Sequence, residues 1–263
     1  MAKKYNKYKK QTSYLNKRIK AILFASIITV VSVLLFGGSI GSYSFEGYLP
    51  KIESYISEKS KPITESKQSN SGLYFSDGSS IPAYSGTQMI PINGDEPFFT
   101  IKEKNLINGS SFEEYVGNDY LGRAKGVFTL ISPEDLISAE GRPELPDPVG
   151  WVGRREGGVY DRSHLKAYTF GGRNDVVNLI TGTISLNQKY MVEVENTVRD
   201  YISTKHKPVL YKVTPYYLGD EKIPRGVLME VLSSEGTIRM NRYIYNVQDG
   251  FSIDYKTGKV SEE

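Results

Sequence analysis

The chain has 263 residues, of which 39% are apolar and 12% aromatic, so it can bury a core and is not intrinsically disordered. Its net charge of +3 comes from residues 1–20, where eight Lys and Arg residues stand without an acid; without them the net charge is −5, which excludes a generally basic nucleic-acid-binding surface. The absence of cysteine excludes disulfides and thiolate metal sites, and two histidines, His164 and His206, exclude a site built from several histidines.

A basic segment and an apolar run begin the chain. Residues 1–20 carry positive charge only, and residues 21–41 form an apolar stretch interrupted by small and hydroxyl-bearing residues. About 20 helical residues span the roughly 30 Å hydrocarbon layer of a bilayer, and flanking basic residues stay on the cytoplasmic side. We therefore predict a basic cytoplasmic segment at 1–20 and a transmembrane or signal helix at 21–41, with the rest of the chain outside the cell.

The fate of this helix depends on the sequence that follows it. The basic segment is long for a signal peptide and no A-x-A site follows, which favours a retained membrane anchor. The small pairs Gly38-Ser39 and Gly41-Ser42 leave cleavage and secretion as the alternative. The predicted location is the extracellular face of the cell membrane or, after cleavage, the medium.

A linker and a packed domain make up the remainder. Residues 42–86 are rich in Ser, Lys, Glu and Gly, with one short helical pattern at 52–56, which is typical of a stalk. The packed domain is predicted at 87–263, because apolar residues lead there into a turn at Asn93-Gly94.

Strand patterns dominate the predicted domain. One amphipathic helix is indicated by Val194, Val198, Tyr201 and Ile202, which recur at helical spacing. We therefore predict an α+β fold with a central antiparallel β-sheet. The β-branched or aromatic runs that predict strands are residues 124–131, 209–214, 227–232, 238–247 and 251–255.

The side chains that can carry chemistry lie between residues 151 and 201. A strand pattern ends at a histidine, a glycine-rich loop and a second strand follow, and then comes the helix, so the order is β, β, α. In sequence these are Tyr160-Asp-Arg-Ser-His164, Gly171-Gly172, Asn178-Leu-Ile-Thr-Gly-Thr183, Asn187 and Glu195.

These residue types suit phosphodiester hydrolysis, which needs a base, a cation beside the leaving oxygen, and donors for the phosphoryl oxygens. His164 can serve as the base, since an imidazole titrates near pH 6.5. Asn187 offers a carboxamide oxygen to a hard magnesium ion, and Glu195 can hold one of the ion's waters or bind it directly. Arg162 and Arg173 are candidates for phosphate contact.

The segment resembles the DNA/RNA non-specific endonucleases, whose D-R-G-H signature, two spaced asparagines and helix-borne glutamate mark the ββα-metal, or His-Me finger, active site. Within that family it looks closest to the streptococcal secreted DNases (streptodornases) and to membrane-bound competence nucleases. Each matching fragment is weak alone, but their shared order is specific. The likeness covers residues 92–258 and includes the stretches 148–151, 178–183, 209–215, 226–230, 245–248 and 253–258.

The resemblance implies roles for the catalytic residues. His164 corresponds to the general base, Asn187 to the magnesium ligand and Glu195 to the carboxylate on the metal side. Arg162 is counted among the catalytic residues because the resemblance implies that it helps to bind the substrate. Two of these assignments have alternatives from the residues alone: Asn187 is also a common helix N-cap residue, and the neighbouring Glu193 can stand in for Glu195.

A second group is predicted to bind substrate or support the site. Asp161 would orient the loop, Asn178 would support the site, and Arg173 and Arg154 would contact phosphate. The alternative for Arg154-Arg155 is an exposed turn.

Two departures from the family pattern and one further histidine complete the list of site residues. Ser163 stands where the family has a glycine, and Ile184 stands where streptococcal relatives carry an arginine, which bears on substrate affinity rather than on the metal. His206, in the polar run Lys205-His206-Lys207, is assigned no role.

The resemblance implies an endonuclease that cuts DNA, and RNA as well, without regard to base sequence. It uses one Mg²⁺, with Mn²⁺ as the alternative, and leaves 5′-phosphate ends. Two rivals come from other classes: a catalytically inactive nucleic-acid-binding or uptake module on the same fold, and an adhesion protein on a Ser-rich stalk. Only the nuclease and the binding module predict DNA binding that weakens steeply with salt.

Overall fold

The computed structural model describes residues 73–153 and 158–263. They belong to one structural unit at 68–263, separate from a unit at 1–67. The predicted basic segment, the apolar helix at 21–41, the pattern at 52–56 and Arg154 lie outside the described residues. Within the described ranges, no helix is long and apolar enough to span a bilayer.

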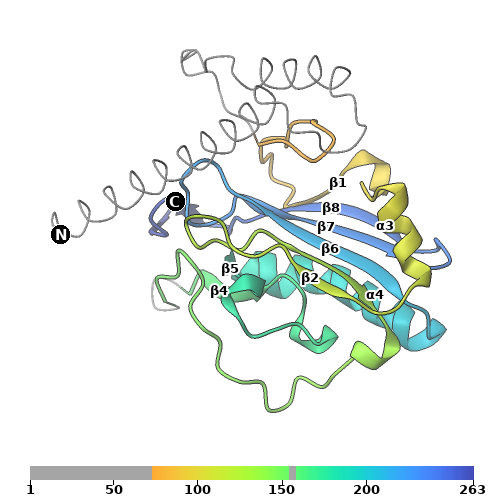
Figure 1. Ribbon diagram of the computed structural model, residues 1–263. Helices are drawn as coiled ribbons and strands as arrows, with labels where there is room; N and C mark the ends of the chain where they lie inside the picture. Colours follow the sequence, from red (N-terminus) through yellow and green to blue (C-terminus); the bar gives the residue numbers. More distant parts are fainter. Residues whose placement is uncertain (1–72, 154–157) are drawn as a thin grey trace, which may run out of the picture. The chain divides into compact units, whose positions relative to one another are not determined.

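A six-stranded sheet runs through the middle of the described domain (Figure 1), in the order β1-β8-β7-β6-β3-β2. Every neighbouring pair is antiparallel, which confirms the predicted central antiparallel sheet. The strands are β1 (Met89–Pro91), β2 (Glu113–Tyr115), β3 (Val127–Ile131), β6 (Val209–Tyr216), β7 (Gly226–Ser233) and β8 (Arg239–Tyr245).

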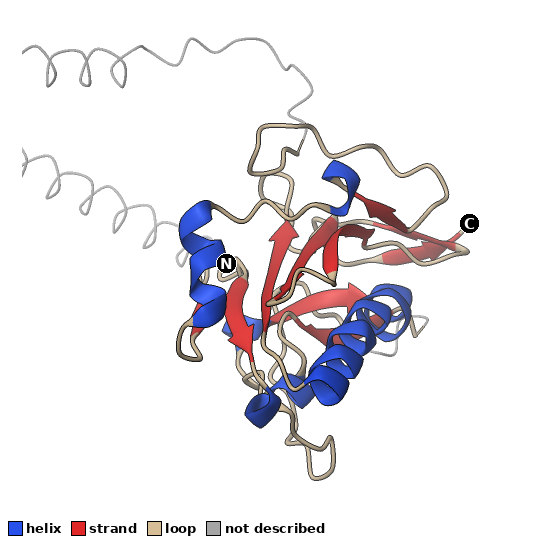
Figure 2. Cartoon of the chain, turned by 90° about the vertical axis from the view of Figure 1, so that its right-hand side faces the viewer, coloured by secondary structure: helices blue, strands red, loops and turns tan. Residues whose placement is uncertain are grey.

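Both faces of this sheet are covered, because alternate side chains of its strands point to opposite sides. In β6, Val209, Tyr211 and Val213 belong to the apolar cluster that includes helix α4 (Val192–Lys205). Leu210 belongs to a second cluster on the other side, with Phe99 and Phe128. In Figure 2 the strands lie between α4 and the shorter helix α3.

Helix α3 (Ile101–Asn105) begins at a capping box, in which Thr100 and Glu103 exchange side-chain and backbone hydrogen bonds. Five residues are too few to show helical periodicity, so the sequence did not predict this helix. The residues that flank it, Phe99 and Ile107, are buried against the sheet and attach it there.

The hairpin β4 (Tyr160–His164) and β5 (Leu179–Thr183) is a separate two-stranded sheet, with Ser163 opposite Ile180. A π-helix, Ser185–Met191, follows β5 and leads into α4. The predicted β, β, α order is therefore confirmed. Ile180 and α4 pack in the same apolar cluster as the sheet, so the hairpin and the helix share its core.

A second hairpin supports the segment that precedes β4. Strand β9 (Phe251–Ile253) pairs with β10 (Val260–Glu262), and both contribute to a cluster around Tyr160 that includes Trp151. The strand predicted at 251–255 is present but ends at Ile253, and β10 was not predicted. This cluster holds Tyr160, the first residue of β4, in place.

The packed domain begins earlier than residue 87. Phe75 is 5% exposed and packs with Tyr216 and Tyr243 of the sheet. The hydroxyl of Tyr245 donates to the Pro82 carbonyl, 2.8 Å away. Residues 73–86, assigned from their composition to the stalk, therefore pack on the domain, because a single phenylalanine in a polar stretch suffices to dock it.

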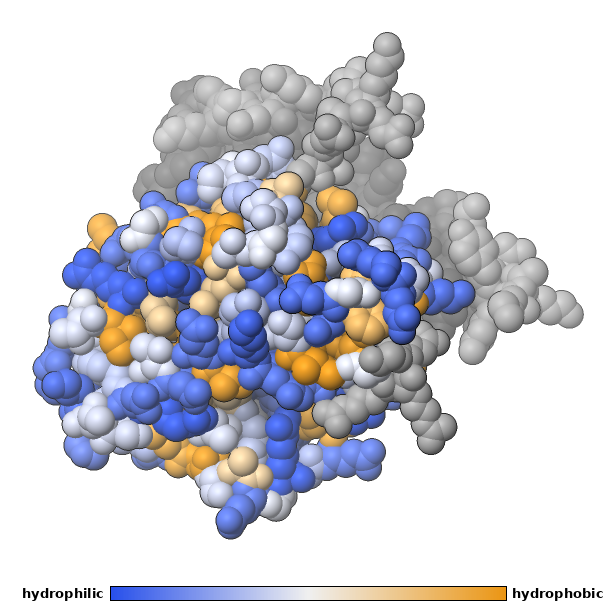
Figure 3. Space-filling view, turned by 180° about the vertical axis from the view of Figure 1, so that it is seen from behind, coloured by the Kyte–Doolittle hydropathy of each residue, from blue (hydrophilic) through white to orange (hydrophobic). Residues whose placement is uncertain are grey.

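The outer surface is mostly hydrophilic. On the face in Figure 3 apolar residues lie in small groups between hydrophilic ones. Ile101 and Tyr120, 80% and 86% exposed, are the most exposed large apolar side chains of the described residues. Scattered apolar residues of this kind are normal on a protein surface.

Candidate active site

His164 ends β4 with its imidazole between two polar side chains. The ring is 6% exposed. Its Nδ1 lies 2.8 Å from Nη2 of Arg142, and its Nε2 lies 2.8 Å from Oδ1 of Asn174. Both ring nitrogens are therefore hydrogen-bonded, and the orientation of the ring is fixed.

The glycine-rich loop brings Asn174 back to the histidine. Gly171 has φ of 76°, in the left-handed region that glycine adopts without strain. A Cβ on Gly172 would lie 2.8 Å from the Ala167 carbonyl oxygen and closer still to that of Lys166, so only glycine fits there. The tight turn after β4 thus requires both glycines.

The guanidinium settles the tautomer of His164. Arginine has donors only, so Nδ1 must accept from Arg142. In a neutral imidazole the other nitrogen then carries the proton, so Nε2 donates to the Asn174 oxygen. Burial lowers the pKa of His164 to about 4, the hydrogen bond to Asn174 raises it, and the Arg142 charge lowers it further. The imidazole is therefore neutral at physiological pH.

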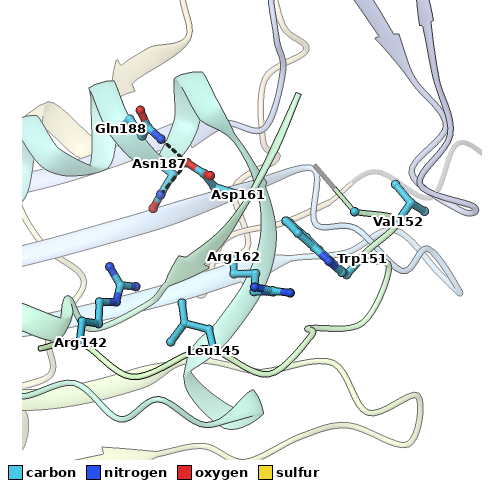
Figure 4. A pocket seen from close by; sticks show the side chains of 9 residues that line it. Arg142, Leu145, Trp151, Val152, Asp161, Arg162, Asn187 and Gln188 are labelled. Atoms are coloured by element: carbon cyan, nitrogen blue, oxygen red, sulfur yellow. Dashed lines mark hydrogen bonds between the residues drawn. The ribbon is translucent and has the colours of Figure 1, made fainter. Parts of the chain in front are cut away.

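Asp161 lies near the other end of β4 and holds two amides (Figure 4). Its Oδ2 accepts from Nδ2 of Asn187 at 3.2 Å and from Nε2 of Gln188 at 2.6 Å. Both amides belong to the π-helix, a rare conformation that often marks functional sites. Figure 4 shows the carboxamide oxygen of Asn187 directed away from Asp161.

His164, Asn187 and Glu195 line one small cavity of about 210 Å³, together with Arg142 and Arg199. A wider cavity of about 750 Å³ is lined by Arg142, Asp161, Arg162, Asn187 and Trp151, among others. The predicted base, the predicted metal ligand and the predicted carboxylate are thus brought together from β4, the π-helix and α4. Asn187 and Arg142 border both cavities.

Glu195 is a part-buried carboxyl on the cavity side of α4. Burial raises its pKa to about 7, although the charges of Arg199 and Arg142 lower it. The neighbouring Glu193 is exposed and lines neither cavity, so the geometry favours Glu195 over that alternative.

The oxygen donors of the small cavity fit a divalent cation. Within residues 73–153 and 158–263, no hydrogen bond reaches the Asn187 carboxamide oxygen or the Glu195 carboxylate. One neutral and one anionic oxygen on the same cavity are a donor set for a hard cation such as Mg²⁺, which keeps several waters. Asn187 and Glu195 are therefore the residues that would hold it.

Arg162 lies in the wide cavity, where it is already paired. Its Nε and Nη2 donate to Oδ1 of Asp147 at 2.9 and 2.6 Å. Its guanidinium stacks over Trp151 at 4.7 Å from the ring centre. This arrangement is consistent with contact to a nucleotide in the wide cavity, but Arg162 does not line the small cavity with His164.

Two residues of the group predicted to bind substrate or support the site line neither cavity. Asn178 is fully buried: its Oδ1 accepts from the Lys166 amide and its Nδ2 donates to the carbonyls of Lys166 and Arg173. It therefore supports the loop after β4 and cannot bind substrate, because no part of it reaches solvent. Arg173 is exposed, pairs with Glu113 at 3.4 Å and lines neither cavity.

The cap alternative for Asn187 is not realised. Neither the π-helix nor α4 begins with a side-chain cap at its N-cap residue, and Asn187 donates to Asp161 instead of accepting from the backbone. At the start of the π-helix, the hydroxyl of Thr183 accepts from the Leu186 amide. Asn187 is thus free to present its oxygen to the cavity.

Several residues of the site were not found from the sequence. Arg142 lies in a segment without helix or strand, and Asn174 follows the glycine-rich loop. Gln188 comes directly after Asn187, and Arg199 lies on the helix that the apolar spacing predicted. Only Asn174 carried a signal, since a second asparagine ten residues after His164 lies across a tight turn.

Comparison with known proteins gives consistent matches. A family model described as DNA/RNA non-specific endonuclease matches residues 104–235, about half of the chain. A deoxyribonuclease of Streptococcus dysgalactiae subsp. equisimilis is 36% identical over 111 residues, 40% of this chain and 34% of that protein. The chain thus matches about a third of the length of that relative.

Solved structures share the fold. NucA from Streptococcus agalactiae with magnesium ion bound superposes with a TM-score of 0.59 at 22% identity, over 66% of this chain and 87% of that one. Sda1 nuclease with bound zinc ion superposes with a TM-score of 0.52 at 30% identity, over 58% of this chain and 80% of that one.

Proposed function

The chain belongs to the DNA/RNA non-specific endonuclease family, and from that premise we propose that it is a divalent-metal-dependent endonuclease that hydrolyses DNA, and RNA as well, without regard to base sequence. One observation carries the proposal: a single cavity is lined by a neutral histidine, a carboxamide oxygen and a carboxylate. The relative named deoxyribonuclease supports DNA as the substrate.

His164 is proposed as the general base. Its hydrogen bond to Asn174 puts the proton on Nε2, so Nδ1 carries the one basic lone pair of the ring. That lone pair takes a proton from the attacking water. The lowered pKa of His164, about 4, keeps this lone pair unprotonated at neutral pH, although it also makes the imidazole a weaker base.

Asn187 and Glu195 are proposed to hold the cation. A divalent cation held by them would stabilise the negative charge on the departing 3′ oxygen, and cleavage of that bond would leave a 5′-phosphate end. Asp161 positions Asn187 by fixing its amide nitrogen, so that the carboxamide oxygen points away from the carboxylate. The solved relatives bind magnesium in one case and zinc in another, and we propose Mg²⁺, with Mn²⁺ as a substitute.

Arg162 and Trp151 are proposed to bind the nucleic acid in the wide cavity, and Arg154, outside the described residues, is proposed as a further phosphate contact. The stacked pair offers a guanidinium to phosphate and an aromatic face to a base. We place the protein on the outer face of the cell membrane, or secreted if the N-terminal segment is cleaved, because that segment is basic and then apolar.

A plasmid-nicking assay tests the proposal. We expect nicking with Mg²⁺ and none with a chelator, and loss of nicking by three orders of magnitude or so in His164→Ala, because general-base catalysis contributes roughly 10²–10⁴-fold. The matched control is His206→Asn: His206 is outside both cavities and has φ of 52°, a conformation that asparagine tolerates.

DNA binding separates the rivals. A binding or uptake module predicts salt-sensitive DNA binding without nicking by the wild-type protein, and an adhesion protein predicts neither. The nuclease proposal predicts that His164→Ala still binds DNA with the salt dependence of the wild type. Metal-independent nicking, or full activity in His164→Ala, would contradict it.

A further inference from the structure

Arg142 makes a contact that conflicts with the role proposed for His164. A general base must offer its lone pair to a water, yet Nη2 of Arg142 lies 2.8 Å from Nδ1 and donates to it. Because Nε2 is already committed to Asn174, the ring has no second lone pair to offer. In the described state Arg142 therefore occupies the lone pair of Nδ1 that the base needs, and we call this contact the cap of His164.

Among the described residues, the guanidinium of Arg142 forms no ion pair with a carboxylate. Its side-chain hydrogen bond there is to His164, and its Cζ lies 5.5 Å from the ring centre of Tyr168. Arg162, by contrast, is fixed by the carboxylate of Asp147. A guanidinium with one hydrogen bond to a neutral imidazole gains more from an anionic phosphate, because the opposite charge and two parallel N–H···O bonds then act together.

The backbone around Arg142 permits such a change of partner. The segment is attached at one end by the Ile137 amide, which donates to the Thr169 carbonyl, and at the other by Thr181, whose hydroxyl donates to the Val149 carbonyl. Between them, residues 138–146 make no hydrogen bond to other described parts of the domain except through the Arg142 side chain. Arg142 itself is exposed.

The position of Arg142 specifies the anion that it would meet. It borders both the small cavity of about 210 Å³ with His164 and the wide cavity of about 750 Å³ with Arg162. A phosphodiester that bridges the two cavities brings two non-bridging oxygens to this boundary, which matches the two parallel donors of a guanidinium.

We propose that Arg142 caps Nδ1 of His164 in the free protein and leaves it for the scissile phosphate, so that binding of nucleic acid both fixes the phosphate and uncaps the base. The inference rests on the proposed nuclease function. No bond is made or broken in this step: one hydrogen bond of the guanidinium is exchanged for two to phosphate oxygens, and the Nδ1 lone pair is freed for water.

The state of Nδ1 is measured by ¹⁵N NMR of the full-length protein, in which His164 and His206 are the only imidazoles. In the free protein we expect the Nδ1 resonance of a hydrogen-bonded acceptor, and in Arg142→Met a downfield shift toward an unbonded nitrogen. With a short DNA duplex in chelator, where hydrolysis cannot proceed, the wild-type resonance should shift to the position of the variant.

Nicking kinetics test the phosphate contact. Hydrogen bonds to charged groups contribute about 1.5–3 kcal/mol, so kcat/KM of Arg142→Met should fall roughly 10- to 100-fold. The matched control is Arg239→Met, which removes an exposed guanidinium of β8 that pairs with Glu96 at 3.5 Å, and which should leave kcat/KM and the Nδ1 resonance unchanged.

Two results would overturn the inference. A kcat/KM of Arg142→Met equal to or above the wild type would show that Arg142 does not bind the scissile phosphate. An Nδ1 resonance that stays in place at saturating duplex would show that Arg142 only tethers its loop. If His164→Ala still nicked DNA, the nuclease assignment of His164 would fail instead, and the resonance of the free protein would still report the cap.

Discussion

Strands β6 and β4 are both buried, but they are held in place by different forces. β6 buries Val209, Leu210, Tyr211 and Val213, whose contribution is the transfer of apolar surface out of water. Four of the five residues of β4 are buried as well, yet three of those four are polar: Asp161, Ser163 and His164. Apolar burial requires only the right volume, whereas each buried polar group requires a particular partner.

The difference separates stability from activity. A substitution in β6 removes apolar contact and lowers the free energy of unfolding without moving the cavity. A substitution of Asp161 or His164 in β4, or of a residue to which either is hydrogen-bonded, leaves a polar partner without its bond and displaces the catalytic groups. The predictions below test this separation, from the largest expected change to the smallest.

Leu210→Ala should be the most destabilising of these substitutions. Leu210 is 0% exposed and packs with Phe128 and Phe99, on the sheet face away from His164. A buried Leu→Ala change costs about 2–5 kcal/mol. Urea unfolding should show this loss, while nicking per folded molecule stays at the wild-type rate. A lower nicking rate of the folded variant would show that stability and activity are not separated between β6 and β4.

A second prediction concerns pH, where His164 and Glu195 oppose each other. The pKa of His164 is lowered to about 4, so its contribution to stability is complete above pH 6.5 and is lost as the pH falls toward 4. The pKa of Glu195 is raised to about 7, so ionisation of that carboxyl destabilises the fold as the pH rises from 4.5 toward 7. Each effect is on the order of 3 kcal/mol.

The two slopes cancel in the wild type between about pH 4.5 and 6.5. Relative to it, Glu195→Gln should become more stable as the pH rises through this window, and His164→Gln should become less stable. Urea unfolding in chelator at a series of pH values measures both differences. If either variant kept the wild-type pH dependence, the corresponding pKa would be close to its ordinary value.

Gly182→Ala should cost about 1–3 kcal/mol, the usual range for an overpacked core. A Cβ there would collide with the Ser163 side chain and lie 2.8 Å from Cδ2 of Leu186. The Ser163 hydroxyl is buried without a hydrogen-bond partner among the described residues, so nothing is lost when it is removed. Adding Ser163→Gly to Gly182→Ala should therefore restore much of the lost stability. If the effects of the two substitutions on the free energy of unfolding were additive, the predicted collision between these residues would be refuted.

The same contrast explains what the sequence could predict. β6 and α4 were found because apolar periodicity reports burial directly, and the ββα order followed from it. His164 and Asn187 were found through the ordered motif. Arg142 was not, because its role depends on a loop path that no periodicity encodes. Asn178, predicted to support the site, was grouped with the substrate-binding residues because sequence spacing cannot distinguish a buried residue that holds a loop from a cavity residue.

The smallest prediction compares two substitutions of similar cost. Gln188→Ala removes a hydrogen bond to Asp161 worth roughly 1 kcal/mol, and Thr100→Ala removes the cap of α3, also worth about 1 kcal/mol. Both should lower the urea midpoint by similar amounts. Only Gln188→Ala should raise the Mg²⁺ concentration for half-maximal nicking, because Gln188 then no longer helps to position the Asp161 carboxylate, which binds the amide of Asn187. Equal metal dependence in the two variants would show that Asp161 fixes Asn187 without help from Gln188.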